Sequence, residues 1–337
     1  NWTVWNGNKN TNTIKQQQIT EQQADLNAAV TANSIQEKIT QLYVQILYSA
    51  EAIKVNESSL EISRNNANRG EDMVKVGQLA KADLAQLKAQ VSTDEYNVVN
   101  AKSTLANYKL QLKQLLELTT EEFDVTEPQT TDEQALSEIP TLNDVYDTAL
   151  ISRPEIQNAS LGIKSSELGI SIAKAGVLPS VNLTSGIGAS TSSLSSSSWG
   201  KQLKTNLNGS IGFSISVPIF DNRSAKTAIN KAKLARQNQE LELQNQQKVL
   251  YSTIENYWLE ANTNQQKFKS AISSVESAQA SYDLVGEQFR LGLKNIVELT
   301  TGKTNLLTAQ QNRLQSKYTT ILNQEMLKFY KGEGIHL

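Results

Sequence analysis

The feature that most constrains this chain is an internal repeat whose two copies lie 215 residues apart. Around Gly77 the residues run acid, spacer, apolar, base, apolar, glycine, and an acid–leucine pair follows at 83–84. The same order recurs around Gly292, with the acid–leucine pair at 298–299. One register holds from residue 5 to residue 84 of the first copy. Such a chain is expected to fold as two related supersecondary units.

Each copy carries the pattern of a long helical hairpin. Apolar positions alternate at spacings of three and four, which average the 3.5 residues of coiled-coil packing, over 35–67 in the first copy and 250–282 in the second. A second periodic stretch follows each glycine, most clearly over 84–115. We therefore expect antiparallel hairpins over residues 9–118 and 223–332, with their tips near 69–82 and 287–298.

The rest of the chain is divided around these hairpins. The first repeat covers 1–118, a connection covers 119–156, the second repeat covers 157–332 and a short tail covers 333–337. The segment 119–141 is acidic and contains two prolines, which is typical of a surface connection. A short helix is expected from about Leu142, and another over 155–175 after the Arg153–Pro154 start signal.

Within residues 178–219, two runs alternate strictly between apolar and polar side chains, which predicts a β-hairpin. Each run has about 11 residues, enough to cross a bilayer as a tilted strand. Residues 190–205 are predicted to form an exposed loop between the runs. A soluble hairpin packed on helices remains the alternative. The side chains expected to face lipid are Val181, Leu183, Ile187, Leu207, Ile211, Phe213, Ile215 and Val217.

The first residues match the end of the second strand run. Residues 2–5 occupy the repeat position of 217–220, so they are expected to end a further strand, preceded by about 70 to 100 residues outside this sequence. Trp5 and Phe220 are the predicted aromatic residues of the membrane interface. With the expected segment added, a chain would hold about four strands. Four strands are too few to close a membrane barrel, so several chains are expected to share one.

Composition excludes most other functions. Lys and Arg number 32 against 34 Asp and Glu, so the net charge of −2 provides no electrostatic attraction for nucleic acid. The chain has no Cys and one His, His336, which removes thiol chemistry and most metal sites. A phosphate-binding Gly–Lys loop is also absent from the sequence. We expect no enzyme activity, cofactor or bound metal.

Several short motifs, in this order, resemble the TolC-like outer membrane efflux proteins. They are the two glycine turns, the Arg153–Pro154–Glu155 helix start, the segment 173–180 entering a strand and the segment 217–220 leaving one. The resemblance covers essentially the whole chain. It implies a homotrimer in the bacterial outer membrane that extends into the periplasm, with a shared twelve-stranded β-barrel and a helical tunnel.

The resemblance also implies roles for the two helical turns. The periplasmic adaptor of an inner-membrane pump would dock on Lys75, Val76, Gly77, Arg290, Leu291 and Gly292, and Asp83 and Glu298 would form the constriction. A second acid that the family often carries is replaced by Thr301. The glycines as simple helix caps, and the acids as ordinary residues of a first helical turn, remain open alternatives.

The function predicted from these observations is a passive exit duct of a tripartite efflux or type I secretion system. Its partners would be the adaptor, the pump and outer membrane lipid. Two other classes remain possible at this point: a periplasmic adaptor, which normally carries one hairpin, and a soluble coiled-coil scaffold, which would carry no lipid-facing strands.

Overall fold

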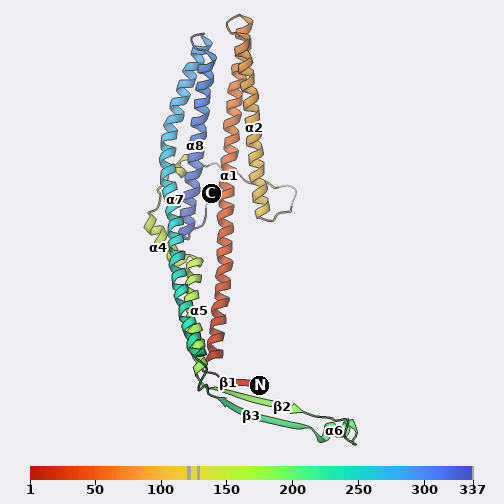
Figure 1. Cartoon of the computed structure of the whole chain (residues 1–337). Coiled ribbons are helices and arrows are strands. Elements are labelled where there is room, and N and C mark those ends of the chain that lie inside the picture. The colour runs from red at the N-terminus through yellow and green to blue at the C-terminus, as the bar shows by residue number, and fades with distance from the viewer. Residues whose placement is uncertain (120–122, 127–129, 336–337) are drawn as a thin grey trace. The chain divides into compact units, whose positions relative to one another are not determined.

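The computed structural model describes residues 1–119, 123–126 and 130–335, and most of them are helical (Figure 1). The four long helices are α1 (Lys9–Lys75), α2 (Lys81–Leu115), α7 (Ser224–Arg290) and α8 (Ile296–Lys331). They lie where the heptad pattern predicts them. The mainly helical fold class is therefore confirmed.

The chain forms two compact units, and each takes residues from both halves of the sequence. The strand unit comprises residues 1–30 and 154–248, and the turn unit comprises residues 31–153 and 249–337. Helices α1 and α7 contribute to both units. Each unit is therefore built from segments that are distant in the chain.

The strand unit contains a three-stranded antiparallel sheet of order β1–β2–β3. Its strands are β1 (Trp2–Trp5), β2 (Ser180–Gly188) and β3 (Asn208–Ser216). Strands β2 and β3 pair along their full length, from Ser180 opposite Ser216 to Gly188 opposite Asn208. Helix α5 (Pro154–Lys174) and a 3₁₀ turn, η1 (Ala175–Val177), lead into β2. The predicted β-hairpin is present.

Two details of this hairpin differ from the prediction. Strand β3 begins at Asn208 and ends at Ser216, so the predicted strand residue Leu207 precedes it, and Val217 and Phe220 lie beyond it; Pro218 has no N–H to donate to a strand ladder. The expected loop also contains a helix, α6 (Trp199–Thr205). The buried Gln202 side chain holds it, accepting a hydrogen bond from the Ser192 N–H (2.8 Å) and donating one to the Ser197 carbonyl (2.7 Å).

Helix packing in the strand unit is largely polar. The Gln16 amide donates to the Ser165 carbonyl (3.1 Å), and Asn158 accepts from Gln23 (3.0 Å) and donates to Asn27 (2.6 Å). Such side chains join α1 and α5 without a large apolar core. This explains how long helices form in a chain that is only 38% hydrophobic.

The turn unit also contains α3 (Asp132–Ala135) and α4 (Leu142–Ser152), of which α4 begins at the predicted residue. Two basic residues of α8 find a partner here. Arg313 and Lys317 both contact the Asp132 carboxylate (2.5 and 3.2 Å). The connection before α4 therefore compensates the charges of α8. Pro128, predicted to lie in this connection, is outside the described residues.

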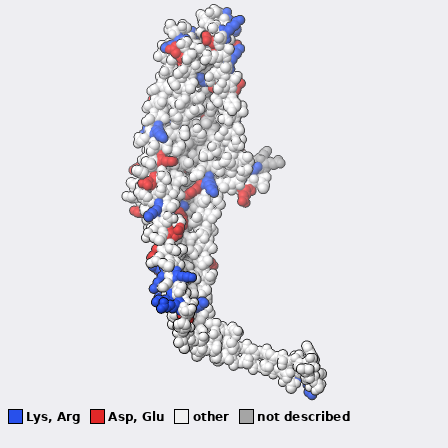
Figure 2. All heavy atoms as spheres, viewed as in Figure 1, with Lys and Arg blue, Asp and Glu red and all other residues white. Residues whose placement is uncertain are grey.

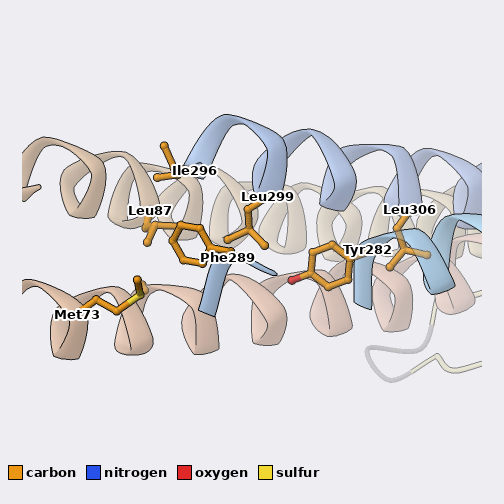
Figure 3. Close-up of a cluster of buried hydrophobic side chains, with 8 residues drawn as sticks. Met73, Leu87, Tyr282, Phe289, Ile296, Leu299 and Leu306 are labelled. Atoms are coloured by element: carbon orange, nitrogen blue, oxygen red, sulfur yellow. The ribbon is translucent and has the colours of Figure 1, made fainter. Parts of the chain in front are cut away.

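Next to the helical turns, residues of all four long helices form one hydrophobic cluster. Figure 3 shows Met73 and Leu87 with Tyr282, Phe289, Ile296, Leu299 and Leu306; Ala67 completes the buried set. Leu299 is 1% and Phe289 3% exposed. Within the turn unit, the two hairpins are thus packed against each other near their tips.

Several structural features recur at the 215-residue offset of the sequence pattern. Helices α1 and α7 each have 67 residues, and α2 and α8 have 35 and 36. The described residues with positive φ also fall into pairs at this offset. These pairs are Gly7 and Asn222, Asn8 and Arg223, Gly77 and Gly292, and Glu117 and Gly332.

Candidate functional site

The two helical turns share one backbone geometry. After α1 the N–H of Gln78 donates to the Met73 carbonyl (2.8 Å) and that of Gly77 to Val74 (3.1 Å); after α7, Leu293 and Gly292 donate in the same way (2.8 and 3.0 Å). Gly77 and Gly292 have φ of 76° and 72°. This is the Schellman motif, in which a left-handed residue ends a helix. The sequence predicted both glycine turns, and the structure shows that each glycine caps a helix.

The residues predicted for adaptor docking are all exposed. Val76 is 68% and Leu291 61% exposed. Lys75 pairs with Asp72 (2.8 Å) and Arg290 with Glu287 (2.9 Å), in each case within the last turn of the helix. Each turn therefore presents an apolar side chain beside an ion pair on a short, hydrogen-bonded backbone.

The two acids predicted for the constriction occupy equivalent helix positions but have different surroundings. Glu298 belongs to a capping box: its carboxylate accepts from the Asn295 N–H (3.1 Å), and the Asn295 side chain accepts from the Glu298 N–H (3.0 Å). The hydrogen bonds from the Lys294 ammonium and the Asn295 N–H hold the pKa of Glu298 below its ordinary value. Asp83 lies in the first turn of α2, whose N-cap residue, Ala80, provides no side-chain cap. The Glu298 charge is compensated, whereas no described ion pair involves Asp83.

A buried polar cluster, which the sequence did not predict, joins three helices of the turn unit. Lys303 of α8 forms an ion pair with Asp94 of α2, and Ser63 of α1 donates to the same carboxylate (2.5 Å). Gln90 donates to the other carboxylate oxygen (3.1 Å). Asp94 and Ser63 are each 2% exposed, and Lys303 is 4% exposed. In the sequence Asp94 and Ser63 are only polar interruptions of apolar stripes, because pairing across 209 residues leaves no local signal.

The strand hairpin separates apolar from polar side chains, as predicted. Val181 lies opposite Ile215, and Leu183 lies opposite Phe213, so these four share one face. The other face carries Asn182 opposite Ser214, Thr184 opposite Gly212, and Gly186 opposite Ser210. Ile211, Phe213 and Ile215 are 77%, 74% and 71% exposed. An apolar face left open to this extent needs a covering environment outside the chain.

Aromatic residues extend this apolar face onto β1. Trp2 lies opposite Leu183, and Trp5 lies opposite Val181 after an irregularity in the register. Of the two predicted interface aromatics, Trp5 belongs to the sheet, whereas Phe220 follows β3 and is exposed. Trp2 lines up with Leu183 and Phe213 in a row across all three strands.

Two features are absent from the described part of the chain: a membrane-spanning helix and a group of metal ligands. No helix in this part is both long and apolar enough to span a membrane. Residues 1–119, 123–126 and 130–335 hold no group of three or more His, Asp or Glu side chains arranged to bind a metal ion.

Comparisons with known proteins identify the class. The family model for the outer membrane efflux protein matches residues 145–333. The outer membrane protein TolC of Escherichia coli (strain K12) is 24% identical over 309 residues, which are 86% of this chain and 59% of that protein. The probable outer membrane lipoprotein SilC of Salmonella typhimurium is 24% identical over 187 residues, 55% of this chain and 39% of that one. The chain spans 59% of the length of the TolC relatives it matches.

Solved structures show the same fold. The chain matches CusC with a TM-score of 0.87 at 16% identity, covering 99% of this chain and 76% of that one. It matches the CmeC outer membrane channel of Campylobacter jejuni with a TM-score of 0.78 at 19% identity, covering 99% and 70%.

The chain belongs to the outer membrane efflux protein family. This membership confirms the resemblance drawn from the sequence motifs and the predicted location in the bacterial outer membrane. The family is one of efflux proteins rather than enzymes. Membership in this family favours the exit duct over the periplasmic adaptor and the soluble scaffold.

Proposed function

We propose that the protein is the passive exit duct of a tripartite efflux or type I secretion system. The strands would cross the outer membrane, and the long helices would extend into the periplasm. The observation that carries the proposal is the exposed apolar face of β2 and β3, joined to helices of 67 residues in a chain of this family. At 1.5 Å per residue such a helix is about 100 Å long.

The proposed assembly is a homotrimer with four strands per chain in a shared twelve-stranded β-barrel and an α-helical barrel below it. Its physical support is the open sheet: β1 and β3 are edge strands of the described sheet and present unpaired backbone groups. Lipid offers these groups no hydrogen bonds, so strands of neighbouring chains must pair with them. The recurring helix lengths support an origin of each chain by internal duplication, with repeats 1–118 and 157–332 around a connection, 119–156, and a tail, 333–337.

The helical turns are the proposed docking site of a periplasmic adaptor. Lys75, Val76 and Gly77, with their counterparts Arg290, Leu291 and Gly292, offer apolar contact beside charge. We expect Arg290→Glu to weaken adaptor binding at least fivefold in a pull-down with the purified adaptor, because it reverses an exposed charge of the proposed docking site. The matched control is Lys267→Glu, which reverses the charge of an exposed residue elsewhere on α7. Equal binding by both variants would remove Arg290 from the docking site.

Asp83 and Glu298 are the proposed constriction, but their surroundings predict unequal roles. In a trimer each position forms a ring of three carboxylates, and a charged ring favours cations. Lys294 compensates Glu298, so we expect Asp83→Asn to lower the cation preference of the conductance more than Glu298→Gln does. Reversal potentials under a salt gradient measure the difference. A larger effect of Glu298→Gln would contradict this reasoning.

The proposed function is tested on the full-length protein in lipid bilayers. A trimer by mass with discrete conductance steps supports the duct. A species that stays out of bilayers and shows no conductance overturns it. The partners of the proposed duct are outer membrane lipid, the adaptor and the pump; neither nucleic acid nor a cofactor is part of the proposal.

A further inference from the structure

One part of the strand unit carries a strongly unbalanced charge. Residues 1–20 and 168–239 contain ten Lys or Arg and a single acid, Asp221, although the chain as a whole is nearly neutral. Figure 2 shows blue side chains gathered where the helices meet the strands, while the hairpin is white except at its tip. Arg236 is already compensated, because Glu167 and Glu240 pair with it (both 3.0 Å).

We define the basic collar as the six residues Lys9, Lys174, Arg223, Lys226, Lys231 and Lys233. All six are exposed. None of them forms an ion pair with another residue that the structure describes. The nearby Asp221 carboxylate instead accepts the Ala225 N–H at the start of α7 (2.7 Å). The collar therefore keeps its positive charge.

Packing at the helix–strand junctions brings the collar together. A Cβ added to Gly7, before α1, would lie 2.9 Å from Leu178 Cβ and 3.3 Å from Ala175 Cα, which follow α5. A Cβ on Gly176 would lie 3.8 Å from that of Ala225, at the start of α7. The ends of α1, α5 and α7 thus meet, and their basic residues surround one junction.

The collar borders the apolar face of the hairpin. The row formed by Trp5, Val181 and Ile215 is at the end of the sheet where β2 begins and β3 ends. Lys9 follows Trp5 by four residues, and Lys233 is nine residues into α7, about 14 Å along its axis. Apolar side chains at this end of the sheet are thus next to unpaired cations, and the distance between the two groups is similar to the thickness of a headgroup layer.

We propose that the basic collar binds the phosphate groups of anionic phospholipids in the periplasmic leaflet of the outer membrane. This inference rests on the proposed function, because it requires the apolar face to lie in lipid and the long helices in the periplasm. Acyl chains would contact the apolar row, and the lysine stems would extend along it to bring their ammonium groups to the phosphates. An anionic lipid can contact both the apolar row, through its acyl chains, and the basic collar, through its phosphate. A small anion in the aqueous lumen could bind only the collar.

The expected strength is large enough to measure. A basic residue beside an anionic membrane surface contributes about a fivefold gain in association at low salt. The attraction is electrostatic, so 1 M salt, with a screening length of about 3 Å, should remove it. Six charges therefore predict a clear preference of the native protein for anionic over zwitterionic lipid.

The test compares two charge-matched triple variants of the full-length protein. The collar variant is Lys226→Gln, Lys231→Gln, Lys233→Gln. The control is Lys248→Gln, Lys267→Gln, Lys269→Gln, which removes three exposed and unpaired lysines farther along the same helix. Each protein is reconstituted in phosphatidylethanolamine bilayers with trace spin-labelled phosphatidylglycerol or phosphatidylcholine. The ratio of the two association constants measures the preference.

We expect the native protein and the control to prefer phosphatidylglycerol at least threefold at low salt, and the collar variant to lose most of that preference. An unchanged preference in the collar variant, or an equal loss in the control, would overturn the proposal. Inorganic phosphate is added at constant ionic strength in a separate arm. If it abolishes the preference, the collar binds a free anion and the lipid assignment is wrong.

Single-channel conductance of the same samples separates this inference from the proposed function. A collar variant that conducts normally and still prefers anionic lipid overturns the lipid inference alone. A native protein that neither inserts nor conducts overturns the proposed function. A collar variant whose ion selectivity changes while its lipid preference stays constant shows that the collar faces the lumen, which also overturns the lipid inference.

Discussion

Replacing Asp94 by alanine should loosen the contact between the two hairpins of the turn unit. Asp94 is 2% exposed, and its carboxylate binds Lys303, Ser63 and Gln90 from three different helices. The substitution leaves the Lys303 ammonium buried without its counter-charge. Removing one partner of a buried ion pair costs about 3–5 kcal/mol. Lys303 is nearly inaccessible, so water cannot replace the lost carboxylate without opening the packing.

The measurement is amide hydrogen exchange along α2 and α8 in the assembled protein, which reports local opening where global two-state unfolding is not defined. A cost of 3–5 kcal/mol corresponds to exchange roughly 10² to 10³·⁵ times faster around residues 94 and 303. The double variant Asp94→Leu, Lys303→Met should stay close to the native rate, since it removes both charges and keeps apolar volume.

The neighbouring pair Arg64–Glu95 is a matched control. It joins α1 to α2 at 2.8 Å, one residue along each helix from Ser63 and Asp94, but its side chains are 57% and 49% exposed. Breaking it by Glu95→Ala should cost less than about 1 kcal/mol. If Asp94→Ala exchanges no faster than Glu95→Ala, burial does not govern the strength of the Lys303–Asp94 contact, and the reasoning is refuted.

Two further predictions concern the strand face and the cap of α8. Phe213→Arg should cost about 2–4 kcal/mol of membrane stability if Phe213 faces the middle of the bilayer, whereas Ser214→Arg, on the opposite face, should be tolerated; the yield of folded protein in membranes separates them. The pKa of Glu298 is lower in the folded protein than its unfolded value of about 4.5. The cap therefore stabilises α8 fully at pH values above 4.5, and this stabilisation is lost as the pH falls through the folded pKa. Amide exchange at residues 295–299 should thus rise at low pH relative to Glu298→Gln; parallel pH profiles would contradict the cap.

The sequence by itself determined the elements of this fold because their signals are local. Heptad spacing depends on residues three and four apart, so it predicted α1, α2, α7 and α8 within a few residues. Glycine adopts a left-handed φ without a side-chain penalty, so Gly77 and Gly292 marked both turns. Alternation separated Phe213 from Ser214 before any register was known.

Only the tertiary structure decided which polar residues find partners. Lys303 and Asp94 are 209 positions apart in the chain, and Arg313 meets Asp132 across 181. Gln202 orders α6 through two backbone groups of the preceding loop that no periodicity marks. Polar side chains interact over a few ångströms with whatever packing brings near them, so their partners depend on the arrangement of helices and loops. The same reason separates Glu298, which is capped and paired, from Asp83, although the two acids hold equivalent places in the repeat.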